Sequence, residues 1–249
     1  MEQPKFVDVH AHLSDAAFDI DRESLLKKLE GYIILNAGEE IEENERILNE
    51  GARHSNLLPC IGLHPNKLSH YDDADTDKAL AYLDEKIPAA FAVSEIGLDY
   101  KLKDEKQMLI QRKVFSKILE TAEKNNKVCI VHSRKSMDDT LDILGNFSVK
   151  AVLHNFEGNL AQLKKALDMG INPSISTGFI RFKKDNVIRA MKNDEFFVET
   201  DSPVLSPDQN RNTPMNIPLI LEYISSIIGT KPIELKNSIY LSFCKMFYG

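Results

Sequence analysis

The feature that most constrains the fold is a regular alternation of short apolar runs with longer stretches of helical spacing. Runs rich in β-branched residues predict strands, whereas apolar positions three and four apart predict amphipathic helices. The predicted strands are residues 5–9, 31–36, 57–61, 89–94, 127–131, 150–153, 171–175 and 196–199. The predicted helices are residues 22–29, 39–54, 75–86, 104–126, 135–146, 159–169, 184–192 and 214–228, followed by a C-terminal helix over 232–247.

Strict alternation predicts a parallel sheet, because a right-handed crossover helix returns the chain to the same strand direction. Eight such units in 249 residues favour a single (β/α)₈ TIM barrel with a C-terminal helix. A doubly wound open sheet is the alternative, but no GxGxxG motif follows the first predicted strand. No linker rich in Pro, Gly or Ser divides the chain, so we expect one domain over residues 1–249.

The charge balance bears on the class of partner. The chain has 31 Lys and Arg residues against 38 Asp and Glu residues, a formal net charge of −7. This balance argues against a broad basic surface for long-range capture of nucleic acid. It does not exclude a phosphate substrate, because bound divalent cations would reverse the sign of the charge inside a cleft.

Two further patterns bear on the cellular setting. No run approaches 18 apolar residues, and no apolar signal segment follows the N-terminus, so we expect a cytoplasmic protein without a membrane partner. Cys60, Cys129 and Cys244 are widely spaced and form no CxxC pair. Because Cys60 and Cys129 lie inside apolar runs, we expect buried, reduced thiols rather than disulfides.

Residues of the types that bind metals collect at the carboxyl ends of five predicted strands. They are His10, His12, Glu95, His132, His154 and Asp201. In a barrel these positions all lie on the face where catalysis occurs. His10 and His12 are two residues apart, so an extended backbone points both side chains the same way. The sequence therefore predicts a metal centre on one rim of the barrel.

Six such ligands exceed what one tetrahedral Zn²⁺ ion needs. Two divalent ions would use them all if one carboxylate bridged them. Glu95 is the expected bridge, because it comes from the side of the barrel facing the first strand and lies next to His132 in strand order. Imidazole with carboxylate suits Zn²⁺ or Mn²⁺, and such mixed sites also accept Mg²⁺.

Each of these residues also has an ordinary structural interpretation. A single His at a strand end is most often a hydrogen-bonded residue, and Glu95 or Asp201 alone could cap the following helix. It is their joint occurrence on one rim that favours ligation. Asp8 has the same parity as His10 but lies one layer deeper, so orienting a ligand is as reasonable a role for it as direct coordination.

Several motifs, taken together, resemble the TatD family of metal-dependent deoxyribonucleases, within the amidohydrolase-like group of barrels. They are DVHAH from Asp8, GLHP from Gly62, EIGLDY from Glu95, HSR from His132, HNFEG from His154 and ETDSP from Glu199, with a looser RNTP from Arg211. The resemblance spans nearly the whole chain, and EIGLDY and ETDSP are its most specific parts.

This resemblance implies a division of the ligands between two ions. His10, His12 and Asp201 would hold one ion, His132 and His154 the other, and Glu95 would bridge them. His64 and Arg134 match positions expected to meet the scissile phosphate. Without the resemblance, His64 would be interpreted as a loop residue before Pro65, and Arg134 as a residue at the start of a helix.

The resemblance also implies an activity, which is hydrolysis of phosphodiester bonds in DNA by a water that two metal ions activate. Asp201 would act as base and ligand, and Glu95 would complete the catalytic pair. The acidic composition favours DNA ends or short single strands, as an exonuclease would use. Glu157 departs from the family pattern and would weaken nucleic-acid binding or change the substrate. The alternatives are hydrolysis of a small ester, amide or lactone at the same site, and a non-catalytic binding barrel.

Overall fold

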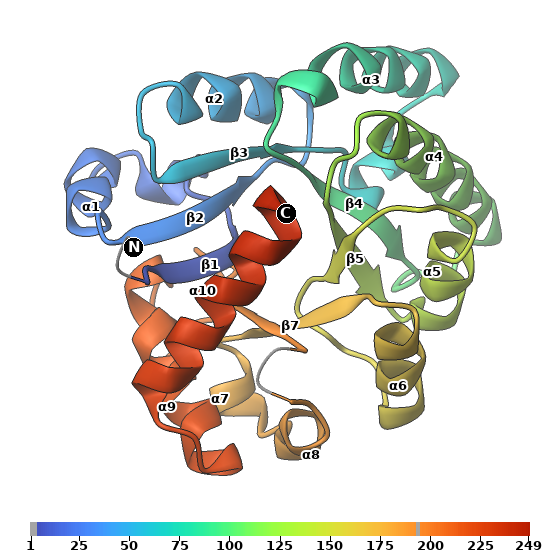
Figure 1. The fold of residues 1–249 in the computed structure, drawn as a ribbon. Helices are drawn as coiled ribbons and strands as arrows, with labels where there is room; N and C mark the ends of the chain where they lie inside the picture. Colours follow the sequence, from blue (N-terminus) through green and yellow to red (C-terminus); the bar gives the residue numbers. More distant parts are fainter. Residues whose placement is uncertain (1–3, 193–194) are drawn as a thin grey trace.

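The computed structural model describes residues 4–192 and 195–249 and contains one sheet of eight strands in the order β1 to β8. Every recorded strand pair is parallel. The strands are β1 (Phe6–Ala11), β2 (Tyr32–Ala37), β3 (Leu57–Ile61), β4 (Ala92–Asp99), β5 (Cys129–Arg134), β6 (Ala151–Leu153), β7 (Asn172–Ser176) and β8 (Phe197–Glu199). They curl into a nearly closed barrel with the helices around it (Figure 1). The predicted (β/α)₈ barrel with a C-terminal helix is confirmed.

The helices follow the strands in the expected alternation. They are α1 (Arg22–Lys28), α2 (Ile41–Gly51), α3 (Asp73–Lys86), α4 (Glu105–Lys124), α5 (Met137–Leu144), α6 (Leu160–Asp168), α7 (Phe179–Phe182), α8 (Asp185–Arg189), α9 (Ile217–Ile228) and α10 (Pro232–Tyr248). Short 3₁₀ turns cover Ala16–Phe18, Pro65–His70, Ile87–Ala89 and Pro214–Asn216. Local signals explain several helix starts: Asp104 caps α4, and Asn159 with Gln162 forms a capping box at α6.

The barrel closes between β8 and β1 through hydrogen bonds at their carboxyl ends. The Asp201 amide donates to the His10 carbonyl over 2.9 Å, and the His12 amide donates to the Ser202 carbonyl over 2.7 Å. The first and last segments of the fold therefore hold His10, His12 and Asp201 against one another, although they are far apart in the sequence.

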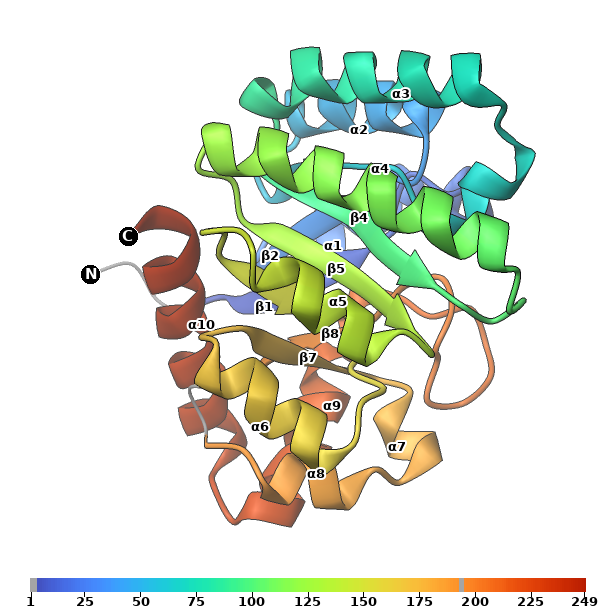
Figure 2. The same cartoon turned by 90° about the vertical axis from the view of Figure 1, so that its right-hand side faces the viewer.

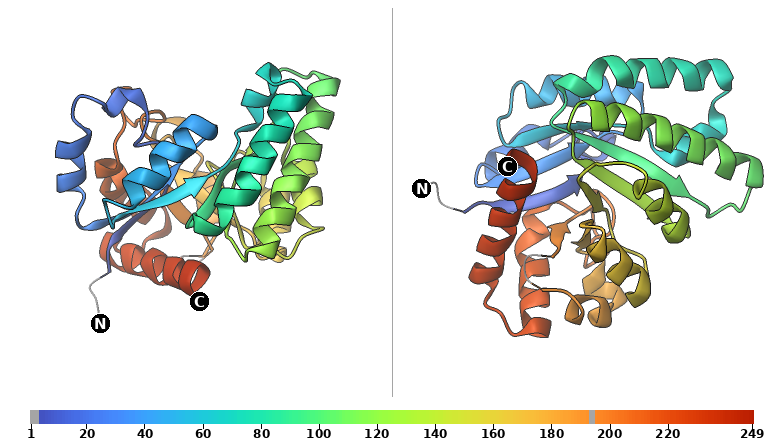
Figure 3. Two further views of the ribbon diagram at one scale, coloured as in Figure 1. Left: turned by 90° about the horizontal axis from the view of Figure 1, so that it is seen from above. Right: turned by 45° about the vertical axis from the view of Figure 1, so that its right-hand side comes forward.

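The two ends of the barrel are different surfaces. In Figure 2 the strand arrowheads of β4 and β5 point to the right, where α7 and the loop after β8 lie, and α10 lies at the opposite end. Figure 3 shows α10 crossing that opposite end below the strands. Its buried residues Leu235, Ile239 and Phe243 face the protein, and the Phe243 ring stacks on Phe247 at 4.6 Å between centroids. The helix closes the amino end of the barrel, so the carboxyl end is the open face.

Several predicted boundaries were wrong in an informative way. The fourth strand was expected to stop at Ser94 with Glu95 at its end, but β4 continues to Asp99 and all eight of its residues are buried. The fifth strand was expected to stop at Val131, but β5 continues to Arg134, which is therefore the last residue of a strand and not the start of a helix. In both strands the apolar residues are followed by polar residues near the open end of the barrel, and the start of these polar residues was interpreted as the end of the strand.

Other differences concern the helices. The short helix α7 was not predicted, and the expected helix over 184–192 is reduced to α8. The expected helix over 214–228 divides into a 3₁₀ turn and α9, because Pro218 at the second position of α9 is compatible only with a helix start. Within the described ranges, no helix is long and apolar enough to cross a membrane. Cys60 and Cys129 are buried free thiols, as expected.

Candidate metal centre

The residues predicted as ligands converge at the carboxyl end of the barrel. His10 and His12 face each other with 3.0 Å between their Nε2 atoms. Asp201 Oδ1 lies 3.5 Å from the Nε2 atom of each of them. All three side chains are almost completely buried, so these donor atoms are removed from bulk water. Two imidazoles and a carboxylate at these distances form a group that could hold a metal ion.

Glu95 lies at the middle of the cluster, with its two carboxylate oxygens turned to different neighbours. Its Oε2 atom is 3.3 Å from His10 Nε2 and 3.5 Å from His12 Nε2. Its Oε1 atom lies 2.6 Å from His132 Nδ1 and 3.5 Å from His154 Nε2. The carboxylate therefore contacts both halves of the cluster, which is the arrangement required of a bridging ligand.

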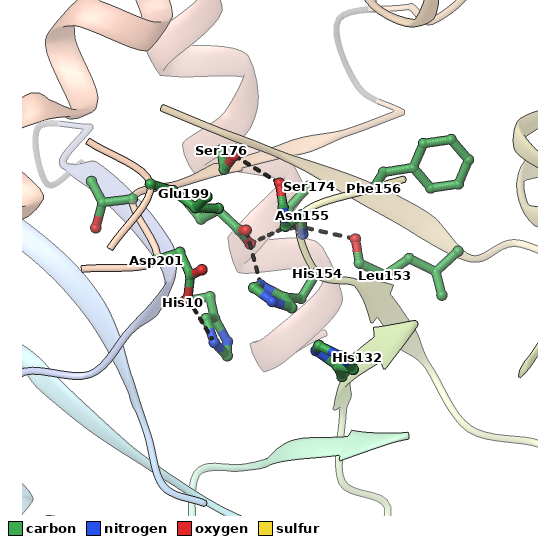
Figure 4. Close-up of polar contacts among 12 residues, drawn as sticks. His10, His132, Leu153, His154, Asn155, Phe156, Ser174, Ser176, Glu199 and Asp201 are labelled. Carbon is green, nitrogen blue, oxygen red and sulfur yellow. Dashed lines mark hydrogen bonds and ion pairs between the residues drawn. The ribbon is translucent and has the colours of Figure 1, made fainter. Parts of the chain in front are cut away.

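The family resemblance implies that His132 and His154 share one ion, but among the described residues these two do not fall into one group of possible ligands. His154 is grouped with His10 and Glu95, because the His10 and His154 ring centroids lie only 4.0 Å apart. His132 is grouped instead with His64 and Glu95. Figure 4 shows His10 of β1, His132 of β5 and His154, just after β6, pointing into the same space.

The outward nitrogens of two imidazoles have acceptors that orient the rings. His12 Nδ1 lies 3.1 Å from the Ala37 carbonyl, and His154 Nδ1 lies 2.9 Å from Glu199 Oε1 (Figure 4). An acceptor at Nδ1 keeps the proton there, which leaves the Nε2 lone pair directed into the site. In both rings Nε2 is therefore the atom that would bind a metal, once the ion displaces any proton held there.

His64 has the opposite arrangement. Its Nδ1 atom accepts a hydrogen bond from the Asn66 amide over 3.1 Å, so in the neutral ring the proton is on Nε2. That Nε2 lies 3.4 Å from Glu95 Oε1. His64 therefore offers the site a hydrogen-bond donor rather than a lone pair, which suits contact with an oxygen of a substrate better than ligation.

Two buried carboxylates beside the cluster were not among the predicted ligands; Asp99 was expected on a loop, shaping the pocket or having a structural role, and it is the last residue of β4. Glu199 is fully buried, accepts a hydrogen bond from Ser174 and pairs with His154. Asp99 Oδ2 lies 3.4 Å from His132 Nε2 and accepts a hydrogen bond from Asn66 over 3.0 Å. Parity was the available signal, because Glu199 is two residues before Asp201 and Asp99 is four residues after Glu95.

Asp8 supports the site by accepting hydrogen bonds from backbone amides and from a hydroxyl group, whereas Glu199 and Asp99 lie beside histidine rings. Its carboxylate accepts hydrogen bonds from the Thr200 amide at 3.0 Å and the Thr200 hydroxyl at 2.6 Å, and from the His10 amide at 3.3 Å. Burial raises the pKa of this carboxyl, against the lowering effect of the Thr200 hydrogen bonds. Asp8 ties β1 to the segment that carries Asp201, and among the described residues none of the groups that could hold a metal ion includes it.

The electrostatics of the cluster fit a bound cation. Burial by itself would lower the pKa of His12 and His154, yet the neighbouring carboxylates Asp201, Glu95 and Glu199 outweigh it and raise both. Burial would likewise raise the pKa of Glu95, but the surrounding histidines hold it well below its usual range. A field that strongly favours positive charge among imidazoles is the field in which a divalent ion would replace protons.

Two glycines allow the strands to approach each other at the site. Gly97 has φ of +137°, and a Cβ there would lie 2.0 Å from the His132 carbonyl oxygen. A Cβ at Gly62 would lie 2.6 Å from the Ser94 carbonyl carbon. Side chains at these positions would push β3 and β5 away from β4, so the glycines of the GLHP and EIGLDY motifs have a steric explanation.

The cluster opens into two neighbouring cavities. One, of about 220 Å³, is lined by His12, His64 and Glu95 together with acidic residues of the β1 and β2 loops. The other, of about 200 Å³, is lined by Arg134, Asn155 and Glu157. Both include His132, His154 and Asp201. The structure therefore brings Arg134 to the edge of the cluster of candidate ligands, with Glu157 lining the same cavity.

A substitution of the buried Glu199 tests the ring-orienting contacts. We expect Glu199→Gln to weaken apparent metal affinity about 10- to 100-fold, with activity largely restored at saturating metal, because the amide keeps the size but loses the charge beside His154. The measurement is activity as a function of metal concentration. Glu50→Gln is the matched control, since Glu50 is also buried but bonds to Ser14 and Asn36. Equal metal dependence in the two variants would contradict the expectation.

Comparison with known proteins places this chain among similar sequences over nearly its full length. Residues 7–248 match the family model described as TatD related DNase. The chain is 31% identical to an uncharacterized metal-dependent hydrolase of Methanocaldococcus jannaschii, MJ1582, over 99% of this chain and 98% of that protein. It is 30% identical to the human deoxyribonuclease TATDN3, over 90% of this chain and 87% of that protein.

The fold is likewise similar to solved structures. The TatD homolog YjjV from Escherichia coli superposes with a TM-score of 0.88 at 23% identity, covering 99% of each chain. A hydrolase of the TatD family from Entamoeba histolytica superposes with a TM-score of 0.84 at 21% identity, covering 100% of this chain and 99% of that one. These likenesses support the barrel architecture over the whole chain.

Proposed function

Since the chain belongs to the TatD related DNase family of metal-dependent hydrolases, we propose that it cleaves phosphodiester bonds in DNA with the help of two divalent ions. The observation that carries this proposal is the position of Glu95, whose two oxygens face different sets of histidines. One carboxylate that contacts both halves of a cluster is the arrangement that two-ion hydrolases need.

The family resemblance implies how the ligands would be divided between the ions. His10, His12 and Asp201, which lie together as one possible metal-binding group, would hold one ion, and His132 and His154 the other, with Glu95 shared between them. When bound, divalent ions supply Lewis-acid chemistry: they favour ionisation of a water at neutral pH and neutralise charge on phosphate oxygens. Zn²⁺, Mn²⁺ and Mg²⁺ are the candidate ions, given the mixture of imidazole and carboxylate.

The side chains of the chain itself would carry the proton and position the substrate. Asp201 would accept a proton from the attacking water, since its carboxylate lies at the junction of both cavities. Arg134 would bind non-bridging phosphate oxygens through its guanidinium, which suits paired hydrogen bonds. His64 would donate from Nε2 to the phosphate or the leaving oxygen, because its Nδ1 is already occupied by the Asn66 amide.

The proposed substrate is the end of a strand or a short single strand. The cavities beside the cluster measure about 220 and 200 Å³, so each receives a small group and not a length of duplex. The formal net charge of −7 also disfavours tracking along a long polyanion. The human relative is named a deoxyribonuclease, which supports DNA as the substrate class.

Turnover by the purified protein is the direct test. The chain should release nucleotides from a short single-stranded DNA in the presence of Mg²⁺, Mn²⁺ or Zn²⁺. A parallel panel of small esters, amides and lactones distinguishes attack on phosphorus from attack on carbon. Turnover of a lactone or an ester without turnover of any phosphodiester would overturn the proposed function while leaving a hydrolytic metal centre in place.

Metal removal is expected to destabilise the fold as well as stop turnover. An ion that binds only the folded state, at about 1,000 times its Kd, contributes about 4 kcal/mol. For a chain of this size each kcal/mol corresponds to about 2–4 °C, so chelation should lower Tm by about 10 °C. Thermal unfolding with and without EDTA measures the difference. An unchanged Tm, with no metal found by elemental analysis before chelation, would contradict the proposed centre.

A further inference from the structure

Exposed cations gather on one part of the open end of the barrel. On the side of the β1 and β2 loops, the cavity beside His12 is lined by Asp15, Glu39 and Glu43. On the side of β5 and β7, the exposed cations are Lys135, Arg181 and Lys183, although Lys135 shares a cavity with the carboxylates Asp138 and Glu157. The part of the opening around α7 is therefore its cationic side, and in a chain with a formal net charge of −7 it is the favourable approach for a polyanion.

The cationic side also carries an exposed aromatic ring. Phe182 is the last residue of α7, and 54% of its surface is exposed. Its ring lies beside Gly178, where an added Cβ would be 3.2 Å from Phe182 Cε2 and 3.4 Å from Leu205 Cβ. Leu205 lines the cavity that contains Arg134, so the ring stands at the edge of the candidate substrate site. Figure 2 shows α7 at the end of the barrel to which the strands point.

One cation lies over this ring, and a second follows it in the chain. The Arg181 guanidinium carbon lies 4.8 Å from the centre of the Phe182 ring. Lys183 follows directly, with its Nζ atom 5.1 Å from the Tyr223 ring. Among the residues that the structure describes, no carboxylate lies within ion-pair distance of Arg181 or Lys183, whereas Lys67 on the acidic side is paired with Glu39 and Glu40. The recorded acidic groups near this segment act on other residues, because Asp185 accepts a hydrogen bond from the Tyr223 hydroxyl and Glu157 acts on the half-buried Lys184.

We propose that Phe182, flanked by Arg181 and Lys183, is a stacking platform for a base of unpaired nucleic acid whose neighbouring phosphate reaches Arg134. An aromatic face with adjacent cations is a combination that binds single-stranded nucleic acid, because every base has a stacking surface and every internucleotide linkage carries a phosphate. A duplex hides its base faces, so the ring selects unpaired strands or frayed ends. This inference rests on the proposed function, for which it supplies the direction of strand entry, over α7 and away from the β1 and β2 loops.

Binding without turnover tests the platform directly. A fluorescent 12-residue oligothymidylate is titrated in EDTA, and anisotropy gives Kd. Phe182→Ala should weaken binding about ten-fold, the size expected for one lost base stack, and Phe182→Trp should restore it. Ile233→Ala is the matched control, because Ile233 is 56% exposed and lies on α10 at the other end of the barrel.

The salt dependence of Kd tests the contribution of Arg181, the charged part of the platform. Arg181→Ala should reduce the slope of log Kd against log salt by about one, the amount expected for one phosphate contact. Arg53→Ala removes an equal charge from an exposed residue in the loop between α2 and β3, at the amino end of the barrel, and should leave the slope unchanged. An abasic strand of the same length should bind wild type and Phe182→Ala equally.

The outcomes separate this inference from the proposed activity. If wild type cleaves DNA but Phe182→Ala binds as tightly as Ile233→Ala, the platform is rejected and the activity stands. If Phe182→Ala weakens binding but wild type cleaves no DNA, the platform stands and the activity is rejected. Equal loss of affinity in Phe182→Ala for the abasic strand would also reject stacking, because such a strand has no base to stack.

Discussion

Replacing Glu95 with Gln should lower the rate of hydrolysis by about two to three orders of magnitude, the size associated with removing one stabilising group from a preorganised site. The amide preserves the volume but removes the negative charge that faces His10 and His12 on one side and His132 on the other. Because that charge is shared by both halves of the cluster, we expect metal content to fall from two ions per chain to one or fewer. Elemental analysis and initial rates at saturating metal measure the two effects.

The control for this variant is again Glu50→Gln. It makes the same change at a carboxylate that is 4% exposed, compared with 3% for Glu95, but that lies outside every metal-binding group of the described residues. Its metal content should match that of wild type. Two ions per chain in Glu95→Gln would show that Glu95 is not the shared ligand, whatever the rate.

The second large effect is expected at Asp201. General acid–base groups contribute about 10²- to 10⁴-fold, and Asp201→Asn should lose a factor in that range. The amide can still contact His10 and His12, but it cannot accept a proton from water. A loss of rate with metal content retained would assign Asp201 mainly to proton transfer, and a loss of both would assign it mainly to ligation.

Asp208→Asn provides the comparison on the same loop. Asp208 is solvent-facing and bonds to Ser206 and Asn210, so the substitution changes the charge of the loop without reaching the cavities. Its rate should stay close to that of wild type. If Asp201→Asn were equally active, Asp201 would have neither role.

The backbone around Asp201 explains why this position is sensitive. Asp201 has φ of +56°, a left-handed conformation that is uncommon for a residue with a side chain. It is held there because its amide donates to the His10 carbonyl and its own carbonyl accepts from the Val204 amide, each over 2.9 Å. Strain that the surroundings compensate is frequent at functional sites, where it aims a side chain in one direction.

Much of the fold was predictable from local patterns. The third strand was predicted with both ends correct, Leu57–Ile61, because it is bounded by polar residues and by Gly62. The errors at β4 and β5 arose because both strands continue beyond their apolar part into polar, buried residues such as Glu95 and Ser133. Apolar periodicity cannot recognise a strand whose inward side chains face a cluster of polar candidate ligands instead of an apolar core.

The candidate ligands were predictable because their residue types and their spacing can be recognised in the sequence. The carboxylates that contact these ligands were harder to predict, because Glu199 and Asp99 reach His154 and His132 through contacts between different strands. The exposed platform at Phe182 lies on α7, a helix of four residues that is too short to leave a periodic signal.

The sequence by itself therefore determined the barrel, the rim on which the site lies and the types of its ligands. These follow from periodicity and strand order, which are local properties of the chain. Only the tertiary structure decided which oxygen of Glu95 meets which histidine, which nitrogen of His64 faces the site, and on which side of the opening the cations lie. Those features depend on distances between segments such as β1 and β8, and a linear sequence does not contain such distances until the barrel closes.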